Sequence, residues 1–182
     1  MQNPSPVEAF IRQFIPDSDD TETWGVLPLR IRSYAVAEVP PLESISSVRC
    51  VVLSGESVLA MDNPDGWALL PGGRREADET LLETLHRELL EESGWTISDP
   101  VLLGFIHYQH LGPKPVDYRY PYPVFTQVVY TARAVTEYPD KRMDDPFEQP
   151  AHFIRVSEAR TLNLRGRDRV FLEAALRHHL SG

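Results

Sequence analysis

The sequence is poor in cysteine and has no apolar run long enough to cross a bilayer. Its single cysteine, Cys50, cannot form an intramolecular disulfide, and its place within Val48–Leu53 predicts a buried core thiol without a catalytic role. The opening segment Met1–Pro6 lacks the basic and then apolar pattern of a secretion signal. These absences predict a cytoplasmic protein that does not bind membranes.

Basic residues are also scarce. The chain has 18 Lys and Arg residues against 27 Asp and Glu residues, which gives a formal net charge of −9. General binding to nucleic acids is therefore not expected, because affinity for the phosphate backbone comes from clustered basic side chains. The length of 182 residues suits a single domain over 1–182, with an N-terminal extension of about residues 1–45.

Acidic residues are instead concentrated between Gly73 and Trp95, where there are six glutamates and one aspartate. An apolar stripe with helical spacing is expected from Leu81, Leu82, Leu85 and Leu89. Glu88, Glu91 and Glu92 follow i, i+3, i+4 spacing, so they share one patch near the end of the same helix. A cluster of carboxylate oxygens is the kind of ligand set that Mg²⁺ or Mn²⁺ requires.

The spacing of this segment resembles a known motif. Gly73, five residues, Glu79, seven residues and then Arg87-Glu88-Leu89-x-Glu91-Glu92-x-Gly94 match the Nudix box at every polar and glycine position. The preceding segment, Trp67 to Gly73, also looks like the entry to that box. One position departs from the pattern, because Trp95 stands where an aliphatic residue is usual. It keeps the apolar character but is bulkier.

The resemblance implies a fold and a chemistry. The fold would be α/β, a Nudix-type α/β/α sandwich with a mixed sheet. The activity would be metal-dependent hydrolysis of the pyrophosphate in a nucleoside diphosphate linked to another group X, with Mg²⁺ as cofactor and Mn²⁺ as the alternative. By the same resemblance, the metal would lie at Glu88, Glu91 and Glu92, with Gly73 giving the loop backbone close access to the metal or phosphate. Arg87 would orient a carboxylate, and Glu79 would pair with Arg87 as structural support.

Other site residues follow from their positions. For the general base, Glu148 is placed ahead of Asp144, Asp145 and Glu137, with a box glutamate as the alternative. Substrate contacts are assigned to aromatic and basic residues, namely Trp67, Arg74, Arg75, Tyr108 and Phe125. The competing interpretation is that the aromatics belong to the core and the arginines form surface pairs. His107 and His110 would lie on opposite faces of a strand, which disfavours a metal pair and favours structural or surface roles.

The expected elements alternate between strands and helices. A helix is expected at 7–15 and a loop at 17–22, then one or two strands within 24–39, a hairpin of 48–53 and 57–61, a loop at 62–66, the box helix, strands at 101–110, 124–135 and 152–156, and a closing helix at 168–180. The N-terminal helix would pack on the body of the protein or on a partner subunit, so a homodimer is one expected assembly.

The substrate stays open at this stage. A nucleoside triphosphate, an ADP-ribose-like compound, a dinucleotide and a nucleotide sugar all fit the resemblance. Two other functions also need to be considered. One is a noncatalytic nucleotide-binding module, although such proteins usually lose box acids. The other is a prenyl-diphosphate isomerase, which is expected to use a catalytic cysteine and is disfavoured by the core position of Cys50.

Overall fold

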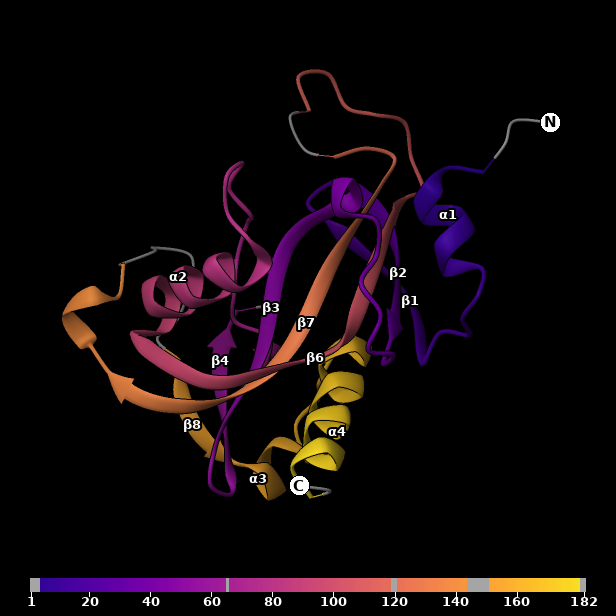
Figure 1. Cartoon of the computed structure of the whole chain (residues 1–182). Helices are drawn as coiled ribbons and strands as arrows, with labels where there is room; N and C mark the ends of the chain where they lie inside the picture. Colours follow the sequence, from indigo (N-terminus) through magenta and orange to yellow (C-terminus); the bar gives the residue numbers. More distant parts are fainter. Residues whose placement is uncertain (1–3, 65, 119–120, 144–150, 181–182) are drawn as a thin grey trace.

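The computed structural model describes residues 4–64, 66–118, 121–143 and 151–180 (Figure 1). The elements in chain order are α1 (Pro6–Ile11), β1 (Ser18–Trp24), β2 (Leu27–Tyr34), η1 (Leu42–Ser44), β3 (Ile45–Ser54), β4 (Ser57–Asn63), β5 (Gly66–Ala68), α2 (Leu81–Ser93), β6 (Trp95–His110), β7 (Val124–Glu137), η2 (Pro139–Lys141), β8 (His152–Arg155), α3 (Val156–Ala159) and α4 (Gly166–Leu180). Within the described segments, no helix is long and apolar enough to span a membrane.

A mixed sheet forms the centre of the molecule. The strand order is β1-β2-β6-β7-β3-β4-β5, and β8 pairs with β4 beside this path. The pairing of β3 with β7 is parallel, and every other described pairing is antiparallel. The long strands β6 and β7 curve across the molecule, with α2 and α4 on different sides of the sheet (Figure 1).

The core lies in two layers because side chains along a strand point to opposite faces. On β3, Cys50 and Val52 face the layer covered by α1 and α2, whereas Val51 and Leu53 face the layer covered by α4. Both layers are closed by apolar helix faces, which buries the sheet on each side. The predicted α/β/α sandwich with a mixed sheet is therefore confirmed, as is the buried position of Cys50.

The N-terminal segment differs from the prediction in two ways. The first difference is that the helix ends at Ile11 instead of residue 15. Within it, Phe10 packs against Phe105 of β6 with ring centroids 5.4 Å apart. Its apolar side thus packs on the sheet of the same chain. The acidic segment predicted as a loop at 17–22 is instead most of the edge strand β1. Backbone pairing with β2 and the ion pair of Asp19 with Arg30 accommodate its charges at a solvent-facing edge.

Other element boundaries differ from the predicted ones by a few residues. Strand β6 begins at Trp95, six residues before the predicted start, because register shifts between Ser98 and Val101 carry the strand past a proline. In the segment predicted as a loop at 62–66, Asp62 and Asn63 instead end β4 and Gly66 begins β5. On α2, Leu85 and Leu89 are fully buried, but Leu82 is 43% exposed and does not belong to the apolar stripe.

Candidate active site

The box helix α2 begins and ends at well-formed caps. The Thr80 hydroxyl accepts from the Glu83 N–H, and the Glu83 carboxylate accepts from the Thr80 N–H, which forms a capping box. The helix stops at Gly94, which has a left-handed φ of 75°. Glu83 thus stabilises the start of the helix. These caps fix where the following carboxylates project.

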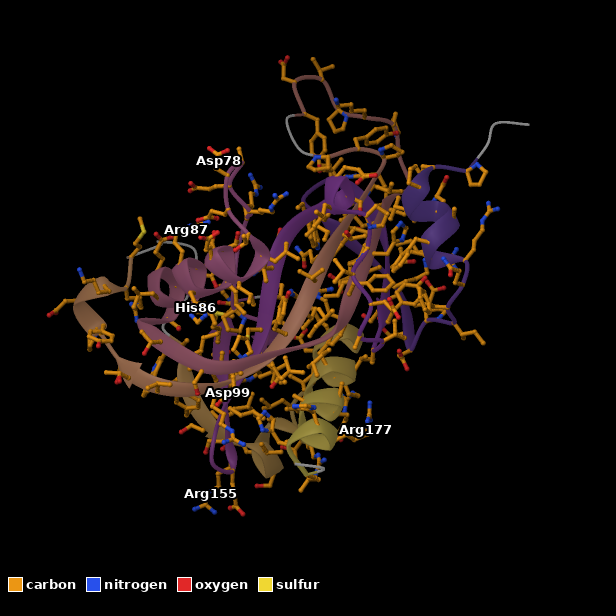
Figure 2. All side chains as sticks on the ribbon, in the orientation of Figure 1. Asp78, His86, Arg87, Asp99, Arg155 and Arg177 are labelled. Atoms are coloured by element: carbon orange, nitrogen blue, oxygen red, sulfur yellow. The ribbon has the colours of Figure 1, made fainter. Side chains whose placement is uncertain are left out.

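Arg87 connects the helix to the loop before it. Its guanidinium makes a bidentate pair with Glu79, with distances of 2.5 Å from Nε to Oε1 and 2.8 Å from Nη2 to Oε2. The same group donates to Glu88 Oε1 at 2.8 Å, to Glu91 Oε2 at 3.1 Å and to the Arg74 carbonyl at 3.0 Å. Figure 2 shows Arg87 beside the loop that carries Asp78. One cation therefore gathers three carboxylates and a backbone carbonyl.

These contacts shift the pKa values of the pair. The hydrogen bonds from Arg87 lower the pKa of Glu79 to about 2, and Thr84 adds a further hydrogen bond at 2.9 Å. In return, the contact with Glu79 raises the pKa of the Arg87 guanidinium. The pair is therefore fully ionised at neutral pH, which suits a structural ion pair between loop and helix.

Two adjacent glycines bring the loop against the carboxylates. A Cβ atom on Gly72 would overlap the Val48 carbonyl, and the φ of 130° at Gly72 also disfavours other residues. A Cβ atom on Gly73 would overlap the Glu88 carboxylate. The Gly72 N–H donates to Glu92 Oε2 at 2.6 Å, and Arg49 donates to the Gly72 carbonyl from the other side. Backbone of the loop thus lies directly beside Glu88 and Glu92.

The donor set has the chemistry of a divalent-metal site. Glu88, Glu91 and Glu92 supply hard oxygen atoms, and the loop closes on them without intervening side chains. In the described part of the chain, however, no three acidic, histidine or cysteine side chains are gathered closely enough to hold an ion. Glu88 and Glu91 instead bind Arg87, and Glu92 binds the Gly72 N–H. Glu88, Glu91 and Glu92 therefore suit a metal ion by residue type and position. Their side chains must change rotamer before all three can bind the same ion.

A cavity of about 190 Å³ opens next to Glu92. It is lined by residues from β1, β3, β4, β5, α2, β6, β7 and the start of α4, namely Trp24, Arg49, Met61, Asn63, Ala68, Leu70, Glu92, Tyr108, Gln127, Arg165, Arg167 and Asp168. It therefore combines one box carboxylate with cationic, amide and aromatic groups from distant parts of the sequence. This composition suits an anionic ligand with an aromatic or polar part.

Two buried charged residues connect α4 to the rest of this cavity. Arg167, only 8% exposed, pairs with Glu22 of β1 at 2.5 Å. Asp168 is 2% exposed, and its Oδ1 accepts from the Leu69 N–H at 2.7 Å. Burial raises the pKa of the Asp168 carboxyl, and the hydrogen bond from Leu69 opposes that shift. The start of α4 is thereby tied both to the N-terminal hairpin and to the segment leading into the box.

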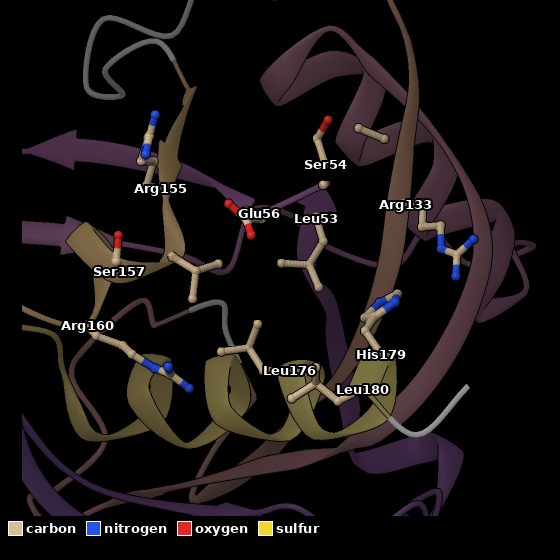
Figure 3. A pocket seen from close by; sticks show the side chains of 13 residues that line it. Leu53, Ser54, Glu56, Arg133, Arg155, Ser157, Arg160, Leu176, His179 and Leu180 are labelled. Atoms are coloured by element: carbon tan, nitrogen blue, oxygen red, sulfur yellow. The ribbon is translucent and has the colours of Figure 1, made fainter.

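A second cavity, of about 780 Å³, is larger but lies elsewhere (Figure 3). It opens between the turn joining β3 to β4, α3 and the last turns of α4. Leu53 and Leu176 project into it, and Arg133 and Arg155 lie on its rim. No box residue lines it. The smaller cavity is therefore the candidate active site, since it is the one that reaches a box carboxylate.

The residues assigned to substrate contact from the sequence are dispersed. Tyr108 lines the cavity beside Glu92, and Phe125 stacks on it with centroids 4.6 Å apart, away from the lining. Trp67 packs edge-on against His152 and the core. Arg74 lies on the exposed side of the loop, and the Arg75 side chain donates to the Glu79 carbonyl. Only Tyr108 of the five lines the cavity.

The remaining assignments separate into two groups. Glu148, Asp144 and Asp145 lie outside the described residues, so the general base stays a prediction. Glu137 is exposed at the end of β7. His107 and His110 point to opposite faces of β6, and both are buried. Of the two roles expected for them, structural or surface, the structural role agrees with this burial.

Sequence reasoning missed most of the cavity lining. Trp24, Arg49 and Asp168 are far apart in the chain and meet only because the sheet brings β1, β3 and α4 together. A signal for part of it was present in the segment 165–169, where three arginines and an aspartate surround the start of a helix. A cluster of this kind next to a helix start is a pattern that anion sites use.

The fold and the site together define a Nudix domain, with the sandwich, the glycine loop and the acid-rich helix in place. The NUDIX domain family matches residues 44–175, and the chain belongs to the Nudix family. A curated relative, the uncharacterised Nudix hydrolase YvcI of Bacillus subtilis, is 38% identical over 56 residues. That match covers 30% of this chain and about a third, 35%, of the relative.

Solved structures are similar in fold. A mutant form of the Bacillus subtilis pyrophosphohydrolase BsRppH is 16% identical, with a TM-score of 0.55. The match covers 91% of this chain and 98% of the BsRppH chain. A NUDIX hydrolase from Nitrosomonas europaea is 20% identical with a TM-score of 0.54, over 75% and 90% of the two chains. The NUDIX domain of Shewanella oneidensis NrtR, in complex with ADP ribose, is 19% identical with a TM-score of 0.53, over 75% and 88%.

Proposed function

We propose that this chain is a Mg²⁺-dependent hydrolase that cleaves the pyrophosphate of a nucleoside diphosphate linked to a group X. The observation that carries the proposal is the complete set of box acids on α2, with Glu92 opening into a cavity lined by arginines. Family membership supports the reaction class. Mg²⁺ is the favoured ion because the donors are carboxylate oxygens, and Mn²⁺ is the alternative.

The chain's own residues have distinct tasks in this reaction. Glu88, Glu91 and Glu92 would hold the metal, which when bound stabilises charge on the phosphate oxygens and lowers the pKa of water. Arg87 keeps Glu88 and Glu91 on the loop side of the helix. Gly73 leaves room for the Glu88 carboxylate beside the backbone. Glu148 is proposed as the base that takes the proton from the attacking water.

The first test is hydrolysis of a substrate panel with Mg²⁺, Mn²⁺ or EDTA. The panel contains nucleoside triphosphates, ADP-ribose, NADH, dinucleoside polyphosphates and nucleotide sugars, with phosphate or nucleotide release as the measurement. We expect one class to be cleaved only with metal, and Glu92→Gln to lower kcat by about 100-fold or more. The matched control is Glu76→Gln, an exposed acid in the same loop, which should leave turnover unchanged. Cleavage that persists in EDTA or in Glu92→Gln would contradict the proposal.

One observation favours a noncatalytic nucleotide-binding module as the second candidate. Glu88 and Glu91 are both engaged by Arg87, so no described group of carboxylates is ready to hold an ion. Nucleotide binding without turnover under every metal would support this alternative. The isomerase alternative is weaker, because Cys50 is fully buried in the sheet and burial raises the pKa of its thiol.

Cellular location and assembly are proposals of the same kind. We keep the cytoplasm as the expected location and a homodimer as an expected assembly. The apolar side of α1 packs on its own sheet, through Phe10 and Phe105, so an interface would have to use another surface.

A further inference from the structure

Three arginines converge on the cavity beside Glu92. Arg49 comes from β3, Arg165 from the residue just before α4, and Arg167 from the first turn of α4. Arg167 is buried and Arg165 is partly buried, so their charges are drawn out of bulk water. A cation in such a place costs free energy unless an anion accompanies it.

The three arginine side chains have different hydrogen-bond partners. Arg49 donates to the carbonyls of Leu70 and Gly72, and Arg167 pairs with Glu22. Arg165 has no hydrogen bond or ion pair from its side chain within the described segments of the chain. Its guanidinium, with five N–H donors, is therefore available to a ligand in the cavity.

Two acids line the cavity beside the three arginines, and Asp168 is near enough to Arg165 and Arg167 for their charges to oppose the rise in its carboxyl pKa that burial causes. Glu92 accepts from the Gly72 N–H, and Asp168 accepts from the Leu69 N–H. A metal at Glu92 would remove more negative charge from the lining. The lining then carries a net positive charge, and it favours a negatively charged group over a neutral one.

The size of the cavity limits what it can hold. Its volume is about 190 Å³. Sites that enclose a drug-sized ligand typically have volumes of about 300–1,000 Å³, so this cavity is smaller. A complete nucleotide derivative does not fit, so only one part of it enters. That part lies next to Glu92, close to where the pyrophosphate would be cleaved.

We infer that Arg165, supported by Arg167, binds a negatively charged group X of the substrate and so makes this hydrolase prefer anionic X over neutral X. The inference rests on the proposed function for the identity of the substrate. Guanidinium groups bind phosphate and carboxylate through paired hydrogen bonds, so both are suitable anions. Arg165 is a specificity-determining residue, and it is separate from the acids that hold the metal.

The first experiment measures anion binding without metal or turnover. Inorganic tripolyphosphate is titrated into the full chain in EDTA by calorimetry. We expect Arg165→Gln to weaken binding about 10- to 100-fold, since a hydrogen-bonded charge is lost. Arg165→Lys keeps the charge but not the paired donors, and should lie in between. The matched control is Arg169→Gln, which changes an exposed arginine in the first turn of α4 that does not line the cavity, and it should bind like the wild type.

The second experiment compares substrates under turnover. A nucleoside triphosphate, uridine diphosphate glucuronate and uridine diphosphate glucose present phosphate, carboxylate and neutral X groups. For the wild type, we expect kcat/KM to be higher for one or both anionic substrates, which also identifies the preferred anion. Arg165→Gln should raise KM for that substrate about 10-fold or more, with kcat little changed. It should leave the neutral substrate unaffected.

The outcomes separate the inference from the proposed function. Equal tripolyphosphate binding by wild type and Arg165→Gln, or no binding by the wild type, would overturn the inference even if metal-dependent hydrolysis is found. A preference for uridine diphosphate glucose over both anionic substrates would overturn it too. Arg165-dependent binding together with no hydrolysis across the panel would instead refute the proposed function and retain an anion site.

Discussion

Arg87 shows how a single residue can organise several acids. Without it, Glu79, Glu88 and Glu91 would repel one another, and Glu91 lies in the last turn of α2, where the helix dipole already disfavours negative charge. Because Arg87 pairs with all three, it compensates their charges and keeps the carboxylates close together. A divalent ion would compensate the same negative charges. Arg87 therefore keeps the carboxylates together before a metal binds.

His107 on β6 leads to a prediction at the scale of a residue. Burial, helped by the nearby Arg32, lowers its pKa to about 4 from an ordinary value of 6.5. Arg32 can only donate, so the 3.3 Å contact makes Nδ1 the acceptor and leaves the proton on Nε2. Among the described atoms, that buried Nε2 has no partner. The folded protein therefore favours neutral imidazole.

The sign of the pH effect follows from this depressed pKa. Between pH 6.5 and 4 the unfolded chain takes up a proton that the folded chain refuses, so stability falls as the pH is lowered through that window. The loss attributable to His107 is on the order of 3 kcal/mol. The free energy of unfolding of His107→Gln, measured by urea denaturation at both pH values, should fall less than that of the wild type. His86→Gln, at an exposed position on α2, is the control, and an equal fall in wild type and His107→Gln would contradict the assignment.

At the scale of elements, the loop before α2 acts as an extension of the sheet. The Val48 N–H donates to the Gly73 carbonyl at 2.9 Å, the Cys50 N–H to the Pro71 carbonyl at 2.9 Å, and the Arg75 N–H to the Ser46 carbonyl at 3.1 Å. The loop is thus bound along β3 by its backbone. Because the other edge of β3 is paired with β7 along its length, the loop is held against a fixed strand and presents a rigid surface to the carboxylates.

Substitutions at the two adjacent glycines should have different effects. Gly72→Ala puts a Cβ atom into the backbone of β3 at a positive φ, so we expect a loss of stability of about 2 kcal/mol or more. Gly73→Ala meets only the end of the Glu88 side chain, which can move. It should keep its melting temperature within a few degrees and lose activity. Thermal unfolding and hydrolysis rates measured on both variants would test this, and similar stability losses in the two would count against it.

At the scale of the whole molecule, Asp168 ties α4 to the segment that leads into the box, across the sheet from α2. Removing its carboxylate in Asp168→Ala leaves the buried Leu69 N–H without an acceptor, which should cost about 1–3 kcal/mol. The melting temperature should fall by about 2–4 °C for each kcal/mol in a chain of this size. Asp168→Asn keeps an accepting oxygen and should retain most of the stability. Equal stability of Asp168→Ala and the wild type would show that the contact is dispensable.

The sequence predicted local features better than long-range ones. The helix of the box and the positions of most strands along the chain depend on neighbouring residues, and these predictions agree with the structure. The loop assigned to 17–22 was wrong because pairing with β2, a tertiary contact, outweighed its acidic composition. The placement of Arg49 and Arg165 beside Glu92 could not be read from spacing, since it depends on how the strands are ordered in the sheet.

The ion pair of Glu22 with Arg167 joins residues 145 positions apart in the sequence. During synthesis, β1 leaves the ribosome long before the start of α4 exists. The wall that Arg165 and Arg167 contribute is added only after α2 and every strand of the sheet have been made. A nascent chain therefore carries the box before it has the complete cavity, and the selection of a substrate proposed for Arg165 requires a later part of the chain than the metal-binding helix.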